Sequence, residues 1–338
     1  GSGRTSSFAL VVNQGGTFAG GSGTHTIGSI ETKNNSNAKM TMTSGECTID
    51  SENSGDNRAI LVETNATFDN NDGTIKITHA GDTNIEFKSG TTSPKCPHNF
   101  TIDKSDNDVK THGDLRIDND LFIKIVDTSH SMRPSSASDT LTVIGDVTLN
   151  KGKLGASTNY TSAISFGSLT IDADGEYIAT SGTTTMTSKN SSNYIMDLDG
   201  TFTHNNGTVR INSTGSGDQL VDLVPSSGTL YDLEINENST NPVQYNGNTT
   251  IANDLTVVEG IFQFYDNNNS NLTVTGDVSI EDGGQLAASG WSGAGEFGSL
   301  SVASGGTYEA TSGTTTITKA NGGTDGRAFY IHSSATFN

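Results

Sequence analysis

A long internal repeat restricts the fold of this 338-residue chain more than any other feature of its sequence. Residues 165–169 (SFGSL) return as residues 296–300 (EFGSL), 131 positions further along the chain. Residues 179–187 return as residues 310–318 at the same spacing, with a single change from Met to Ile. Such self-similarity is typical of repeat architectures, in which each unit packs mainly against its neighbours.

Two further markers give nearly the same spacing. Residues 66–75 (ATFDNNDGTI) correspond to residues 200–209 (GTFTHNNGTV), and the motif starts again at residues 335–338. Residues 119–121 (NDL) recur at residues 253–255, 134 positions later. We expect one continuous solenoid of about 2.5 repeats, each of 131–139 residues, with both ends internal to a longer protein. The expected repeat phases are residues 1–66, 67–200 and 201–335, with a fourth repeat starting at residue 336.

Short bursts of alternating apolar residues predict β-strands throughout each repeat. Examples are residues 169–171, 208–211 and 272–274, and clusters of Gly, Asn, Asp and Ser separate such bursts. No segment has the 3.6-residue periodicity of a helix, so helices should be almost absent. With 31% hydrophobic residues and 40 Gly, the chain suits a thin core better than a thick globular one.

This pattern predicts an all-β protein, a parallel β-helix or β-solenoid with short strands and corners rich in Gly and Asn. The alternative is a series of tandem β-sandwich domains, each of about 100 residues with longer strands. Closely spaced small motifs, such as residues 200–203 (GTFT) and 207–210 (GTVR), favour the solenoid. At about 20–25 residues per turn, the chain would make about 14 to 17 turns.

Three segments carry a family resemblance: residues 200–209, 166–171 (FGSLTI) and 310–318 (ATSGTTTIT). They resemble the repeats of very large secreted bacterial surface proteins, adhesin-like, with predicted parallel β-helix stalks. The resemblance is compositional and covers most of the chain. It implies a role in adhesion, sheaths or filaments at the cell surface, and it brings no catalytic residue with it.

The charge and hydropathy of the chain exclude two classes of partner. The formal net charge is -20, and no basic stripe is present, so nucleic acid is not expected to bind. No apolar run approaches the roughly 18–20 residues that cross a bilayer, so no membrane-spanning segment is expected.

The densest group of carboxylates is Asp172, Asp174 and Glu176, the residue type that glycosidases use in pairs. A site that belongs to the repeat should recur in register. The counterparts 131 positions later are Ala303, Gly305 and Thr307, so the cluster is not part of the repeat. We therefore expect a solvated turn here and predict neither catalytic nor cofactor-binding residues.

Calcium is the one metal for which the sequence offers candidates. Asp69, Asp72 and Asp266 lie in loops that concentrate oxygen ligands, as hard cations prefer. Neither loop has the spacing of an EF-hand or of a calcium β-roll, and Asx residues also form ordinary corners. The seven histidines show no spacing suited to zinc or copper, and His204 corresponds to Asn70 in the preceding repeat.

Cys47 and Cys96 correspond in register to Thr184 and Thr229, so one repeat has both cysteines and the next has neither. A pair that is gained or lost together predicts a disulfide, which would contribute about 3–4 kcal/mol and indicate an oxidising, extracellular setting. Two independent buried thiols are the alternative.

The sequence thus predicts a non-enzymatic structural segment of a long extracellular fibre, stalk, sheath or filament. Its expected partners are neighbouring repeats or further copies of the same protein, and possible glycans. One alternative is a carbohydrate-acting β-helix such as a polysaccharide lyase, hydrolase or phage tailspike. Another is an adhesin that binds glycans or surfaces. Several Asn-x-Ser/Thr sequons would be glycosylation acceptors if a glycosylation system is present: Asn65, Asn99, Asn159, Asn206 and Asn271.

Overall fold

A computed structural model of the chain describes residues 9–53, 57–88, 95–155, 160–213, 217, 219–237, 241–264, 270–287, 291–319 and 326–338. These residues form short strands and no helix, and the strand pairs with a defined register are parallel. The chain is a parallel β-solenoid of about 12 turns, which confirms the predicted fold class. Tandem β-sandwiches are excluded, because their sheets are antiparallel.

The chain divides into two compact units. Unit 1 comprises Gly1–Ser165 and Asp172–Ile178, and unit 2 comprises Phe166–Ile171 and Ala179–Asn338. The strands of unit 1 are β1 Leu10–Val12, β2 Thr17–Ala19, β3 His25–Ile27, β4 Ile30–Thr32, β5 Lys39–Thr41, β6 Glu46–Ile49, β7 Arg58–Val62, β8 Thr67–Asp69, β9 Thr74–Ile77, β10 Thr83–Phe87, β11 Asn99–Lys104, β12 Val109–His112, β13 Leu115–Ile117, β14 Leu121–Ile125, β15 Ser131–Pro134, β16 Leu141–Val143 and β17 Asp146–Leu154. Two strands contain residues of both units, β18 Ile164–Phe166 and β19 Ser168–Ile178.

The strands of unit 2 are β20 Thr183–Met186, β21 Tyr194–Leu198, β22 Thr201–Thr203, β23 Thr208–Ile211, β24 Gln219–Asp222, β25 Ser227–Gly228, β26 Asp232–Asn236, β27 Val243–Asn246, β28 Thr249–Ile251, β29 Leu255–Phe264, β30 Leu272–Ile280, β31 Gly284–Ala287, β32 Gly295–Val302, β33 Thr307–Tyr308, β34 Thr315–Ile317, β35 Phe329–Ile331 and β36 Thr336–Phe337.

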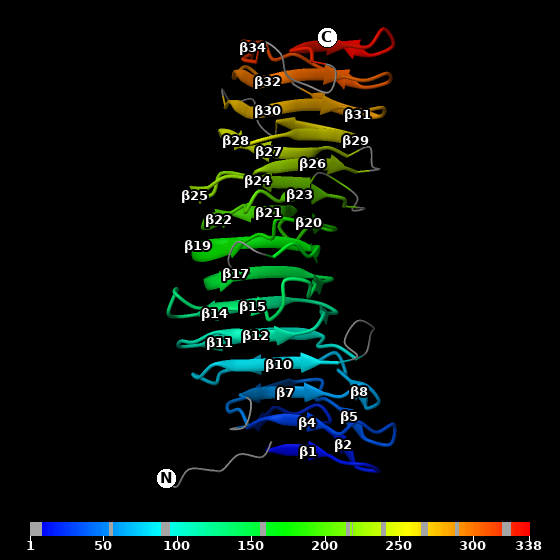
Figure 1. The fold of residues 1–338 in the computed structure, drawn as a ribbon, viewed down its shortest axis with the longest axis vertical. Helices are drawn as coiled ribbons and strands as arrows, with labels where there is room; N and C mark the ends of the chain where they lie inside the picture. Colours follow the sequence, from blue (N-terminus) through cyan, green and yellow to red (C-terminus); the bar gives the residue numbers. More distant parts are fainter. Residues whose placement is uncertain are drawn as a thin grey trace. The chain divides into compact units, whose positions relative to one another are not determined.

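In unit 1, strands of successive turns stack in chain order, as Figure 1 shows for β4, β7, β10 and β12. A second column runs through β3, β6, β9, β11 and β14. Its inward positions are His25, Cys47, Ile75, Phe100 and Leu121, each the register partner of the next. The last four of these side chains are at most 2% exposed, so each turn extends a continuous apolar core.

Unit 2 has an equivalent column of aliphatic side chains. Val209, Leu233, Leu255, Val278 and Leu300 are successive register partners, and each is at most 2% exposed. Parallel sheets that are covered on their inner face favour such branched apolar residues, because one side chain packs directly on the next.

The turns vary in length, and many are longer than the expected length of about 20–25 residues. A short turn separates the register partners Phe100 and Leu121, whereas a much longer one separates Leu300 from Phe329. The chain therefore makes about 12 turns, and the expected 14 to 17 turns are too many. Corners of variable length and several longer strands, such as β19 with 11 residues, account for the difference.

Candidate functional site

Both units use the same corner, built on a Thr-Ser-Gly sequence. In each copy the N–H of the glycine donates to the threonine hydroxyl over 3.0 to 3.2 Å. The hydroxyl of Thr43 donates in turn to the carbonyl of Gly23, and that of Thr311 donates to the carbonyl of Gly293 over 2.6 Å. The hydroxyls of Thr43 and Thr311 thus join their corners to the preceding turn. The three threonines are Thr43, Thr180 and Thr311.

The Asn-Asp-Leu marker of the repeat also has a structural role. Asp120 Oδ1 accepts the N–H of Asp146 on the next turn over 2.8 Å. At the corresponding position of unit 2, Asp254 Oδ1 accepts the N–H of Asp277 over 2.7 Å. The repeat has therefore kept a carboxylate that links the backbones of adjacent turns.

An aromatic side chain makes a third recurring link. Tyr160 donates from its hydroxyl to the carbonyl of Pro134 over 2.8 Å. Trp291, 131 positions later, donates from Nε1 to the carbonyl of Ser270 over 2.5 Å. The two residues differ in chemistry but fulfil the same requirement, a donor for a backbone carbonyl of the preceding turn.

The carboxylates of Asp172, Asp174 and Glu176 each contact a side chain of the adjacent strand β17. Asp172 Oδ2 accepts a hydrogen bond from Asn150 Nδ2 over 2.7 Å. The other two carboxylates form ion pairs with lysines of β17: Lys151 Nζ to Asp174 Oδ2 at 3.5 Å, and Lys153 Nζ to Glu176 Oε2 at 2.9 Å. Each carboxylate thus has its own partner on β17, an arrangement that stabilises strand pairing.

The loop with the calcium candidates Asp69 and Asp72 is a tight corner. Asn71 and Asp72 have φ values of 50° and 55°, and Asp69 Oδ1 accepts the N–H of Asn71 over 3.0 Å. The side chain of Asp72 is 86% exposed. Among the described residues, no group of three or more His, Cys, Asp and Glu is arranged to hold a metal ion. The third candidate, Asp266, lies outside the described residues.

The corresponding corner of unit 2 shows the role of the His204 side chain. Asn205 and Asn206 have φ values of 45° and 60°, close to those of Asn71 and Asp72. His204 Nδ1 accepts the N–H of Asn206 over 2.9 Å, as the side chain of Asn70 does for Asp72 over 3.1 Å. The pairing of His204 with Asn70 in register therefore reflects a shared acceptor within the corner.

The predicted disulfide is not formed in this structure, in which Cys47 and Cys96 are both free, buried thiols. Cys47 lies two turns before Phe100, and Cys96 precedes Phe100 closely in the chain. Two turns correspond to roughly 9–10 Å along the stack, which exceeds the limit of about 7 Å between the Cα atoms of a disulfide. Burial, with a smaller effect of Glu46, raises the pKa of Cys47 to about 11. Burial, with Asp118 beside the thiol, raises the pKa of Cys96 to about 12.

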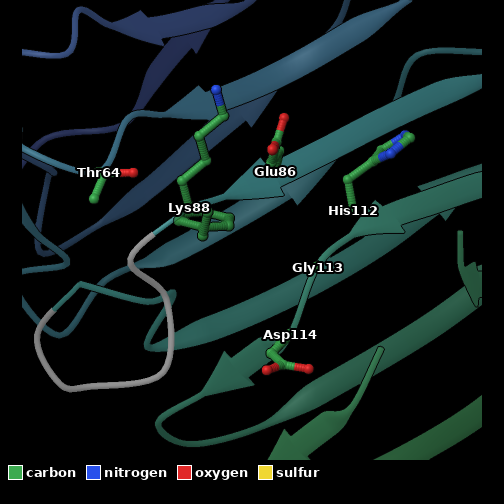
Figure 2. Close-up of a pocket in the computed structure, with 7 residues that line it drawn as sticks. Thr64, Glu86, Lys88, His112, Gly113 and Asp114 are labelled. Carbon is green, nitrogen blue, oxygen red and sulfur yellow. The ribbon is translucent and has the colours of Figure 1, made fainter. Parts of the chain in front are cut away.

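A hollow of about 350 Å³ opens on the outer surface of unit 1. It lies where β10 and β12 end, and Glu86 of β10 is the register partner of His112 of β12. Figure 2 shows Glu86 between Lys88 and His112, with Asp114 beyond the strand end. Its lining consists of Thr64, Glu86, Phe87, Lys88, His112, Gly113 and Asp114.

Sequence reasoning missed this hollow for a geometric reason. Glu86 and His112 belong to different turns and become neighbours only through the register of β10 and β12. Since the turns vary in length, spacing along the sequence does not reveal which outward side chains meet. No signal in the sequence distinguishes these outward positions from other polar positions on strands.

Comparison with protein-family models, curated proteins and solved structures found no match for this chain. Among its described residues, no helix is long and apolar enough to cross a membrane.

Proposed function

We propose that this chain is a non-enzymatic structural segment of a long extracellular fibre, stalk, sheath or filament. The supporting observation is the use made of its recurring polar side chains. Thr43, Thr311, Asp120 and Asp254 all hydrogen-bond to the backbone of a neighbouring turn. The polar residues that recur between repeats thus hold neighbouring turns together. Selection for a long, stiff fibre would preserve such residues.

The carboxylates also favour a structural role over polysaccharide cleavage. A retaining or inverting glycosidase needs two carboxyl groups that face the substrate, one of them protonated. Asp174 and Glu176 each form an ion pair with a lysine of β17 instead.

The extracellular location belongs to the proposal and rests on the resemblance to secreted surface proteins. The cysteines give it no support, since buried free thiols occur in any compartment. Within such a protein, the partners of this segment would be the adjoining repeats or further copies of the same chain.

Immunogold electron microscopy of the source cells, with antibodies against this chain, tests the proposal. We expect label along extended structures at the cell surface. Label confined to the cell interior would refute the proposal. Release of reducing ends or unsaturated products from a panel of polysaccharides by the purified chain would also refute it and would favour the carbohydrate-acting alternative.

A further inference from the structure

The hollow at the ends of β10 and β12 is lined by polar groups, some of which have partners within the fold. Lys88 Nζ pairs with Glu63 Oε1 at 2.8 Å. The N–H of Gly113 donates to Asp139 Oδ2 over 3.2 Å. His112 Nε2 lies within hydrogen-bond distance of Asn84 Oδ1, at 3.0 Å.

Two other polar atoms of the lining remain open to a ligand. His112 Nδ1, the second ring nitrogen, has no hydrogen-bond partner among the described residues. Asp114 Oδ1 accepts both the N–H and the hydroxyl of Thr140 at 2.8 Å, and among the described residues no donor contacts its Oδ2. Glu86 Oε2, in contrast, is buried and has Arg58 Nη2 at 3.1 Å as an ion-pair partner.

Unit 2 provides an internal comparison, because a corner of the same kind recurs there. Asp222 and Asn246 are register partners, as Glu86 and His112 are in unit 1. Gly247 has a φ of 75°, close to the 73° of Gly113.

The corner of unit 2 is closed by an apolar side chain. A Cβ atom on Gly247 would lie 2.9 Å from Val224 Cγ2, whereas a Cβ atom on Gly113 would meet nothing within 4 Å. Val224 takes the place after Asp222 that Lys88 takes after Glu86. The space beside Gly113 therefore reflects the residues of this one copy and is not a general consequence of the corner.

We propose that this hollow binds a saccharide unit, whose hydroxyl groups form hydrogen bonds with His112 Nδ1 and Asp114 Oδ2. A saccharide carries many hydroxyl groups, which both donate and accept, in a small volume, and about 350 Å³ lies at the lower end of the range for small-molecule sites. The two carboxylates and the net charge of -20 disfavour anionic ligands. This binding adds to the proposed structural role and does not depend on it.

A glycan array probed with the full chain tests this proposal, with neutral, amine-bearing and acidic oligosaccharides on one surface. The strongest oligosaccharide is then titrated in a calorimeter against the wild type and variants. We expect saturable binding of a neutral or amine-bearing oligosaccharide with one site per chain. Asp114→Asn, which retains Oδ1 for Thr140, and His112→Ala should each lower the affinity at least tenfold.

Asn246→Ala, at the position in unit 2 that corresponds to His112, is the matched control and should leave the affinity unchanged. Circular dichroism and urea unfolding confirm that each variant is folded, and the near-isosteric Asp114→Asn keeps the test valid if His112→Ala does not fold. The proposal is overturned by an array without saturable binding, by preference for acidic oligosaccharides, or by full affinity in Asp114→Asn.

Discussion

Gly73→Ala tests the packing of adjacent turns at a single atom. Gly73 follows Asn71 and Asp72 at the corner before β9, and a Cβ atom there would lie 1.9 Å from the carbonyl oxygen of Thr43. Real Cβ atoms essentially never approach another heavy atom closer than 3.0 Å, so the backbone must move to relieve the contact. The adjacent hydrogen bond, from the N–H of Thr74 to the carbonyl of Gly45, is 2.9 Å long and would be broken by such a shift.

The magnitude follows from these contacts. Overpacking a filled site costs about 1–3 kcal/mol, and each lost backbone hydrogen bond removes about 1 kcal/mol. We therefore expect Gly73→Ala to lower the free energy of unfolding by about 2–4 kcal/mol, read from the urea midpoint at constant m-value.

Gly23→Ala is the matched control, because a Cβ atom on Gly23 meets nothing within 4 Å and its φ is not positive. It should leave the stability unchanged or raise it by up to about 1 kcal/mol through reduced freedom of the unfolded chain. Equal unfolding midpoints for Gly73→Ala and the wild type would refute the stacking geometry at this corner.

Three further predictions concern the thiols, a buried amine and a corner carboxylate. Cys47 and Cys96 should react with Ellman's reagent as two thiols in denaturant and as none in the native state, and reductant should not change the urea midpoint. If the chain shows no titratable thiol after unfolding without reductant, the two cysteines form a disulfide and this prediction is wrong. Burial lowers the pKa of Lys104 from 10.5 to about 8, so the unfolded state binds more protons between these values and the free energy of unfolding should rise with pH there; a Lys104→Met variant that keeps the full slope would contradict this. Asp254→Ala should lower the stability by about 1–3 kcal/mol, because the N–H of Asp277 loses its acceptor, and an unchanged urea midpoint would show that this link is dispensable.

The fold class was predictable because strand periodicity and the repeat agree. Residues 208–211 were expected as a strand and form β23, with Val209 and Ile211 inward and Thr208 and Arg210 outward. Other boundaries were not predictable. Residues 169–171 were expected as a strand followed by a solvated turn at Asp172, Asp174 and Glu176, but all of these residues belong to the single strand β19, because Asp172 and Asp174 continue the strand with partners on β17.

The repeat alignment pairs each position with its counterpart in another copy, but it does not say which side chain lies on the next turn. Because the corners vary in length, Glu86 and His112, which are direct neighbours, were not considered together. Cys47 and Cys96 were paired because both occur in one repeat and neither in the next, an observation that does not place them on adjacent turns.

Diffraction from aligned fibres of the native material tests the central claim most directly, namely that this chain is a parallel β-solenoid segment whose stacked turns build a fibre. The strands would then lie across the fibre axis, and a strong reflection at about 4.8 Å is predicted along that axis. The same reflection perpendicular to the axis, or its absence from material that contains the chain, would contradict the account.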